Sequence, residues 1–223
     1  MHIEEYDFSI TGVLKEGFRR TDGVKWIFMG AILLYYIIQL VFGLTILTFI
    51  PSLAQVIDQI VAILTLPISV GIVMLGINRA REQELHIHDI FNYFNDFPQL
   101  LLAYFLMVIL IVGGFMLFIL PGIYLAVAYS FVLPLLVDKK LGVWEAMELS
   151  RKTITKQWFS FFGLGIVAAI FVLVSAIPLG IGLIWSLPTV YIAYGLLYHR
   201  LFDDVDEVNE IEEEVEVTTN EES

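Results

Sequence analysis

Long apolar stretches alternate along the chain with short segments that carry the basic residues. No Lys or Arg lies between Lys25 and Arg79, and two later stretches, 100–137 and 159–198, carry no charged residue. A membrane-spanning helix needs about 20 apolar residues, so each stretch has room for two spans. Breaks rich in proline and glycine divide them, as turns do. The pattern predicts six spanning helices, over residues 26–50, 59–77, 100–119, 121–137, 159–177 and 181–199.

The composition strengthens this assignment to a polytopic membrane protein of the all-α class. Hydrophobic residues make up 58% of the 223 residues and charged residues 16%, whereas soluble domains average about 45–50% and about 25%. The chain has no cysteine, which excludes disulfides, thiolate metal sites and cysteine nucleophiles.

The basic residues predict how the chain is oriented. With six spans, all twelve fall on one side of the membrane, in the N-terminal segment, the second and fourth loops and the C-terminal segment. Basic residues concentrate on the cytoplasmic side of membrane proteins. We therefore expect both termini in the cytoplasm and the protein in a cytoplasmic (inner) membrane. These residues are Lys15, Arg19, Arg20, Lys25, Arg79, Arg81, Lys139, Lys140, Arg151, Lys152, Lys156 and Arg200.

The acidic residues gather at the end of the chain. Residues 203–223 hold eleven of the 24 acids and no base, and account for most of the net charge of -12. Such a segment buries too little apolar surface to fold, so we expect a membrane domain over 1–202 and a disordered cytoplasmic tail over 203–223. The tail is a solvated terminus or, through Glu212, Glu213 and Glu214, a docking site for a basic protein partner. The acidic balance disfavours nucleic acid.

Three short segments precede the odd-numbered spans: 9–25, 85–99 and 143–157. In the second segment Ile87, Ile90, Phe91 and Phe94 recur at helical spacing. Amphipathic helices of this kind lie in the membrane interface with the apolar side down, so we expect three cytoplasmic interfacial helices.

These segments also suggest an internal repeat. The Leu-Pro pair at 120–121 recurs at 187–188 and, more weakly, at 66–67. The repeat unit would be an interfacial helix, a span and a proline-bearing span, present three times. Such repeats occur in transporters, and they also arise by duplication without a transport role. The first and third segments share four residue types, with Glu16, Arg19, Thr21 and Trp26 matching Glu148, Arg151, Thr153 and Trp158.

The region 120–158 resembles a bacterial membrane superfamily. The matching residues include Leu120-Pro-Gly-Ile-Tyr, Asp138-Lys-Lys-Leu-Gly and Leu149-Ser-Arg, and Leu14-Lys-Glu-Gly-Phe is similar to the superfamily's usual start. This largely uncharacterised superfamily includes the membrane domain attached to some glycerophosphodiester phosphodiesterases. The resemblance implies six helices in a bacterial inner membrane. It implies no chemistry, because the phosphodiesterase activity belongs to a separate soluble domain.

Residues that could perform chemistry are scarce. No charge falls at mid-membrane, where it would indicate function, and no nucleophile triad or phosphate-binding loop is present. Glu82, Glu84, His86, His88 and Asp89 form the one cluster with metal-ligand residue types. A helix from Leu85 on would direct the two imidazoles about 200° apart, which favours a solvated segment over a metal site. We therefore predict no catalytic, cofactor or metal residues.

Two functions remain open. The first is a non-enzymatic membrane scaffold or accessory subunit. The alternative is a carrier or binder of a lipid-like or neutral amphipathic substrate, in a cavity between kinked even-numbered spans. The expected partners are membrane lipids, a protein partner and, through the small residues Gly165 and Ala169, a second copy of the chain. The candidate cavity-lining residues are Gln39, Pro67, Tyr124, Tyr129, Pro188, Tyr191 and Tyr194.

Overall fold

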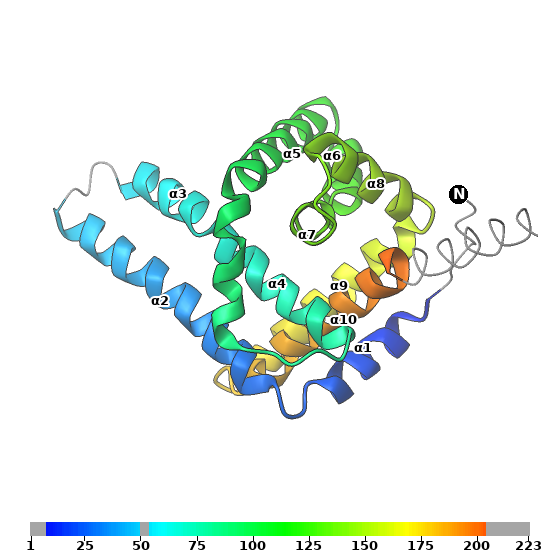
Figure 1. The fold of residues 1–223 in the computed structure, drawn as a ribbon, viewed down its shortest axis with the longest axis horizontal. Helices are drawn as coiled ribbons and strands as arrows, with labels where there is room; N and C mark the ends of the chain where they lie inside the picture. The colour runs from blue at the N-terminus through cyan, green and yellow to red at the C-terminus, as the bar shows by residue number, and fades with distance from the viewer. Residues whose placement is uncertain (1–7, 50–53, 204–223) are drawn as a thin grey trace, which may run out of the picture.

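The computed structural model describes residues 8–49 and 54–203, and these residues form helices and connecting turns without any strand (Figure 1). The all-α prediction is confirmed for this part of the chain. The tail residues Glu212, Glu213 and Glu214 lie outside it. The helices are α1 (Ile10–Arg20), α2 (Lys25–Phe49), α3 (Ala54–Leu64), α4 (Leu66–Ala80), η2 (Ile87–Asp96), α5 (Phe97–Leu117), α6 (Ile119–Ala128), α7 (Val132–Asp138), α8 (Val143–Thr155), α9 (Trp158–Ala176) and α10 (Leu183–Phe202).

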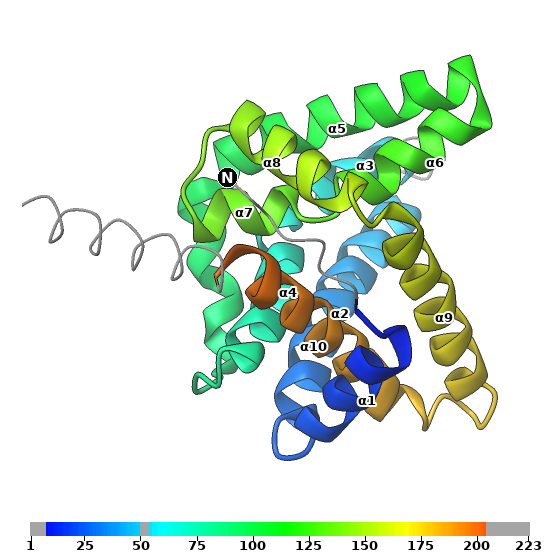
Figure 2. The same ribbon diagram turned by 90° about the vertical axis from the view of Figure 1, so that its right-hand side faces the viewer.

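Three helical hairpins extend from a common centre. They are α2 with α3, α5 with α6, and α9 with α10, and the two helices of each pair contact each other. In Figure 2 the α5–α6 hairpin crosses the top of the molecule, while α9 runs down its side. Large apolar side chains such as Leu120 and Leu179 are exposed near the hairpin ends. Apolar surface of this extent marks a face that contacts another apolar phase.

Within the part of the chain that the structure describes, four helical segments are long and apolar enough to cross a membrane: Lys25–Leu44, Ile87–Leu117, Ile119–Asp138 and Trp158–Ala176. A fifth results if the bent pair Val56–Leu64 and Leu66–Ala80 counts as one span. The helix α10, which corresponds to the sixth predicted span, is not among them. It carries polar residues such as Ser186 and Thr189 along its length, and both are buried against neighbouring helices.

Two predicted spans are interrupted. The second consists of α3 and α4, which meet at Thr65 with a bend of 45°. Pro67 causes the break, because it lacks the N–H that a continuous helix would need. The amide of Gln39 on α2 donates to the hydroxyl of Thr65 at 2.9 Å, which supplies a polar partner at the bend. The fourth predicted span likewise divides, into α6 and α7, with a turn over 129–131.

The three amphipathic segments form helices. Two of them, η2 and α8, pack on helices that precede them in the chain, and α1 packs on the last helix, α10. The helix η2 packs on α4, α8 packs on α6 and α7, and α1 packs on α10. Each amphipathic helix therefore covers helices from the second, fourth or sixth predicted span, and α1 covers the last of these, α10 (Figure 1).

The helix η2 differs from the expected amphipathic α-helix, because it is a 3-10 helix. With three residues per turn, positions three apart share a face. Ile90 is therefore fully buried and Tyr93 packs on the core, while Phe91 and Phe94 are exposed and stack on each other. The apolar residues of this segment therefore divide between a face buried in the protein and an exposed face. The location of this helix in the membrane interface stays a prediction.

The closest helix crossing joins α4 to α10. A side chain added at Gly76 would collide with the carbonyl oxygen of Tyr191, and one added at Gly195 would collide with the carbonyl oxygen of Gly76. The backbones approach this closely only because both positions lack a Cβ atom. The buried apolar residues form two clusters among the described residues, and α4 and α10 contribute to both. This crossing therefore lies at the centre of the molecule.

We expect Gly195→Ala to destabilise the protein by about 1–3 kcal/mol, because the new methyl group meets rigid backbone atoms. Gly113→Ala is the matched control, since no atom lies within 4 Å of a Cβ at Gly113 and alanine is the better helix former. Thermal unfolding in detergent, followed by tryptophan fluorescence, measures both. Equal unfolding midpoints for the two variants would contradict the close crossing.

Candidate functional site

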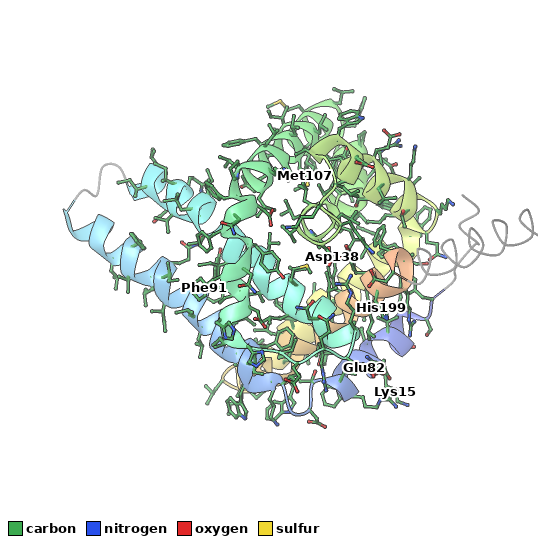
Figure 3. The ribbon with its side chains drawn as sticks, in the orientation of Figure 1. Lys15, Glu82, Phe91, Met107, Asp138 and His199 are labelled. Carbon is green, nitrogen blue, oxygen red and sulfur yellow. The ribbon has the colours of Figure 1, made fainter. Side chains whose placement is uncertain are left out.

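An ionic cluster joins the ends of α4, α7 and α10. The guanidinium of Arg81 donates to both oxygens of Asp138, at 2.7 and 2.6 Å, and to both oxygens of Asp203, at 2.7 and 2.8 Å. The hydroxyl of Tyr198 donates to Asp138 at 2.8 Å, and the ammonium of Lys139 lies 2.8 Å from Asp203. Figure 3 labels Asp138 and His199, the latter also bonded to Asp203. We call these six residues the end cluster.

The end cluster is largely withdrawn from solvent. The side chains of Arg81, Asp138 and Asp203 are 18%, 13% and 16% exposed. Partial burial acts to raise the pKa of Asp203, but hydrogen bonds from Arg81 and Lys139 outweigh it and lower that pKa from 3.8 to about 2. The hydrogen bonds to Asp138 and Asp203 raise the pKa of Arg81 above its usual value, against the effect of its burial. Arg81 and Asp203 are therefore charged at neutral pH.

The sequence did not predict that the residues of the end cluster pair with one another. Sequence reasoning used Arg81 and Lys139 only to orient the chain, and it assigned Asp203 to the acidic tail. The structure makes Asp203 the C-cap of α10 and a partner of Arg81, 122 positions earlier. One sequence feature could have indicated the end cluster, because charged residues follow the second, fourth and sixth predicted spans. Both carboxylates of the end cluster, those of Asp138 and Asp203, pair with basic residues. The cluster therefore holds helices together rather than forming an open reaction centre.

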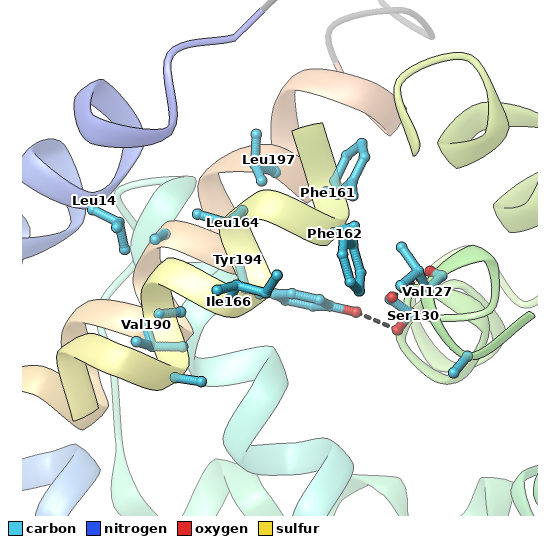
Figure 4. A pocket seen from close by; sticks show the side chains of 15 residues that line it. Leu14, Val127, Ser130, Phe161, Phe162, Leu164, Ile166, Val190, Tyr194 and Leu197 are labelled. Atoms are coloured by element: carbon cyan, nitrogen blue, oxygen red, sulfur yellow. Dashed lines mark hydrogen bonds between the residues drawn. The ribbon is translucent and has the colours of Figure 1, made fainter. Parts of the chain in front are cut away.

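An apolar pocket opens on the side of the molecule between α1, α6, α9 and α10. Its volume is about 430 Å³, and its walls include Leu14, Val127, Phe161 and Phe162. Tyr194 on α10 lies across it and donates its hydroxyl hydrogen to the carbonyl oxygen of Ser130 (Figure 4). The tyrosine hydroxyl is thus already bonded, which leaves mainly apolar surface to a ligand. We call this the lateral pocket.

A second, smaller pocket adjoins the lateral pocket. Its volume is about 320 Å³, and Leu14 lines both. The other lining residues are Lys15, Phe18, Val167 and Phe171, from α1 and α9. Lys15 makes no ion pair with any residue in 8–49 or 54–203. An apolar surface with Lys15 at its edge therefore runs between these two helices.

Of the seven candidate cavity-lining residues, Tyr194 lines the lateral pocket and the other six do not. Gln39 bonds Thr65 and Tyr35, and Pro67 is buried at the start of α4. Tyr191 packs on Phe28. These residues shape and pack helices rather than surround one space.

The remaining three candidates also have packing roles. Pro188 is buried inside α10. Tyr129 is the C-cap of α6 and packs on the larger of the two clusters of buried apolar residues. The hydroxyl of Tyr124 is 2.7 Å from that of Thr155 on α8. The lateral pocket was missed because α1 and α9 supply much of its wall, and a search restricted to even-numbered spans excludes both.

The pKa of Asp203 gives a prediction about acid. Because folding lowers this pKa, the ionised carboxylate stabilises the fold fully above about pH 4, and this contribution is lost as the pH falls through about 2. We expect the unfolding midpoint of the wild-type protein to fall between pH 5 and pH 2, and Asp203→Asn to have a lower midpoint at pH 5 and a smaller fall. Asp22→Asn, which removes an exposed acid, should behave as wild type. An identical pH profile for Asp203→Asn would exclude this role.

Comparison with family models, with curated proteins and with solved structures finds no match to the chain.

Proposed function

We propose that the protein is an integral membrane protein that binds a phospholipid, with an acyl chain in the lateral pocket. The observation that carries this proposal is the pocket of about 430 Å³ with apolar walls between α1, α6, α9 and α10. This size lies within the range of about 300–1,000 Å³ common for ligand sites. The proposal develops the lipid-binding alternative, while a scaffold role for the chain stays a prediction.

The charge beside the pocket favours an anionic lipid. Lys15 lies at the adjoining pocket and has no acidic partner there. An ammonium group at the edge of an apolar groove suits a phosphate headgroup whose acyl chain lies in that groove. We therefore propose that phosphatidylglycerol binds more tightly than phosphatidylcholine.

The six-span arrangement with both termini in the cytoplasm, in a bacterial inner membrane, is part of the proposal. The end cluster supports it, because it gathers the ends of the second, fourth and sixth predicted spans on one side. Lys25, at the start of α2, lies 5.1 Å from the ring centre of Trp185, near the start of α10. Upright spans would separate these two residues, so the proposal requires a sixth helix that is strongly inclined to the first, beyond the average tilt of about 20°.

A threefold repeat is also part of the proposal. The cyclic packing of η2 on α4, α8 on α6 and α7, and α1 on α10 supports it. So does a recurrent contact near the start of the odd spans: Lys25 meets Trp185, and the indole N–H of Trp158 donates to the carbonyl oxygen of Tyr124 at 3.3 Å.

Filling the lateral pocket tests lipid binding. We expect Ala169→Phe to lower the retention of phosphatidylglycerol about tenfold, because the ring occupies the space of the acyl chain. Leu173→Phe is the control, since Leu173 is exposed one turn further along α9 and does not line the pocket. Native mass spectrometry after delipidation and back-titration measures bound lipid. Equal retention in both variants would refute the proposed site.

Cysteine labelling tests the topology, and the natural chain has no cysteine to interfere. We expect Leu179→Cys, at an exposed hairpin end, to react with a membrane-impermeant maleimide in intact spheroplasts. Glu82→Cys, in the turn after α4, should react only after the membrane is permeabilised. Reaction of both from the same side would contradict the six-span arrangement.

A further inference from the structure

We propose that His86, His88 and Asp89 form a binding site for a divalent transition-metal ion such as Zn²⁺. Their ligand atoms, one from each residue, all lie within 4.8 Å of one another. The proposal does not depend on lipid binding, because no residue of this group lines either pocket.

The backbone at His86 brings the two imidazoles to one side. A helix from Leu85 on would have separated them, but η2 begins only at Ile87, and His86 is extended with φ -126° and ψ 140°. Because His86 lies outside η2, the angular separation of two helical residues does not apply to this pair. The ring centres of His86 and His88 are 5.2 Å apart. The sequence analysis expected a helix that directs the two imidazoles about 200° apart, and the extended backbone at His86 removes this objection to a metal site.

Asp89 has no Lys or Arg partner among the residues that the structure describes, which sets it apart from comparable acids. Among residues 8–49 and 54–203, six acidic residues are neither exposed nor fully buried. Five of them pair with Lys or Arg, whereas Asp89 faces His86 at 3.9 Å and His88 at 3.6 Å. A half-buried carboxylate is costly unless a positive charge compensates it, and a bound cation would supply that charge. The five paired acids are Glu16, Asp96, Asp138, Glu148 and Asp203.

The site has a fixed base and adjustable ligands. One oxygen of Asp89 accepts the backbone N–H of His86 at 2.9 Å, which orients the carboxylate, as hydrogen bonds do for metal ligands. Ile90 beside it is fully buried against the backbone of α4 at Gly71. The side chains of His86 and His88 are 56% and 73% exposed, so they have room to turn inward to the metal–nitrogen distance of about 2.0–2.1 Å.

The donor set indicates the type of ion. Two imidazole nitrogens and one carboxylate oxygen suit zinc and its first-row neighbours, whereas magnesium and calcium prefer oxygen ligands alone. Three protein ligands leave at least one position for water. We therefore expect selective binding of Zn²⁺ or Co²⁺ over Mg²⁺.

Titration of metal-free protein tests the site. The protein carries no histidine tag, is stripped with a chelator and is titrated with Zn²⁺ by calorimetry in detergent. We expect one saturable site per chain and an affinity at least about tenfold weaker in His88→Ala and in Asp89→Asn. Glu84→Gln removes a neighbouring exposed acid outside the group and should bind as wild type.

A stability readout guards against misfolded variants. Zn²⁺ should raise the unfolding midpoint of wild type and Glu84→Gln but not of His88→Ala, because an ion that binds only the folded protein stabilises it. Without metal, His88→Ala should unfold as wild type, since the His88 side chain is 73% exposed. No saturable binding by wild type, or undiminished binding by His88→Ala, would overturn the proposal.

Discussion

The guanidinium of Arg81 makes the interaction on which the rest of the arrangement depends. It bonds Asp138 and Asp203 with four hydrogen bonds and so joins the ends of α4, α7 and α10. Removing one partner from such a withdrawn cluster leaves an uncompensated charge, at a cost of about 3–5 kcal/mol in fully buried cases. The cluster thereby holds α4, α7 and α10 together at one end.

The close packing of α4 against α10 and against η2 positions the two candidate sites. The close crossing of α4 and α10 places Tyr194 beside α6 and α9, where the lateral pocket forms. On the other flank of α4, Gly71 lets η2 approach its backbone, and this contact sets the base for His86, His88 and Asp89. The centre of the molecule thus supports the proposed lipid site in the apolar region and the proposed ion site among polar residues.

Sequence reasoning predicted some of the site residues and missed others for identifiable reasons. Of the candidate residues Tyr194 lines the lateral pocket, whereas Leu14 and Phe161 belong to an interfacial helix and an odd-numbered span, which the search for kinked even spans left out. His86 was judged by helical geometry, although it precedes the helix. Side-chain proximity across 60 or more positions, as between Tyr198 and Asp138, has no local sequence signal.

The sequence by itself determined the helical class and the approximate helix limits, because apolar stretches of sufficient length between polar segments leave the backbone few alternatives to helix. Only the tertiary structure decided that Pro67 divides the second predicted span, that Asp203 pairs with Arg81, and that η2 is a 3-10 helix. These features depend on which helices meet and how closely they pack. Periodicity within one segment carries no information about that.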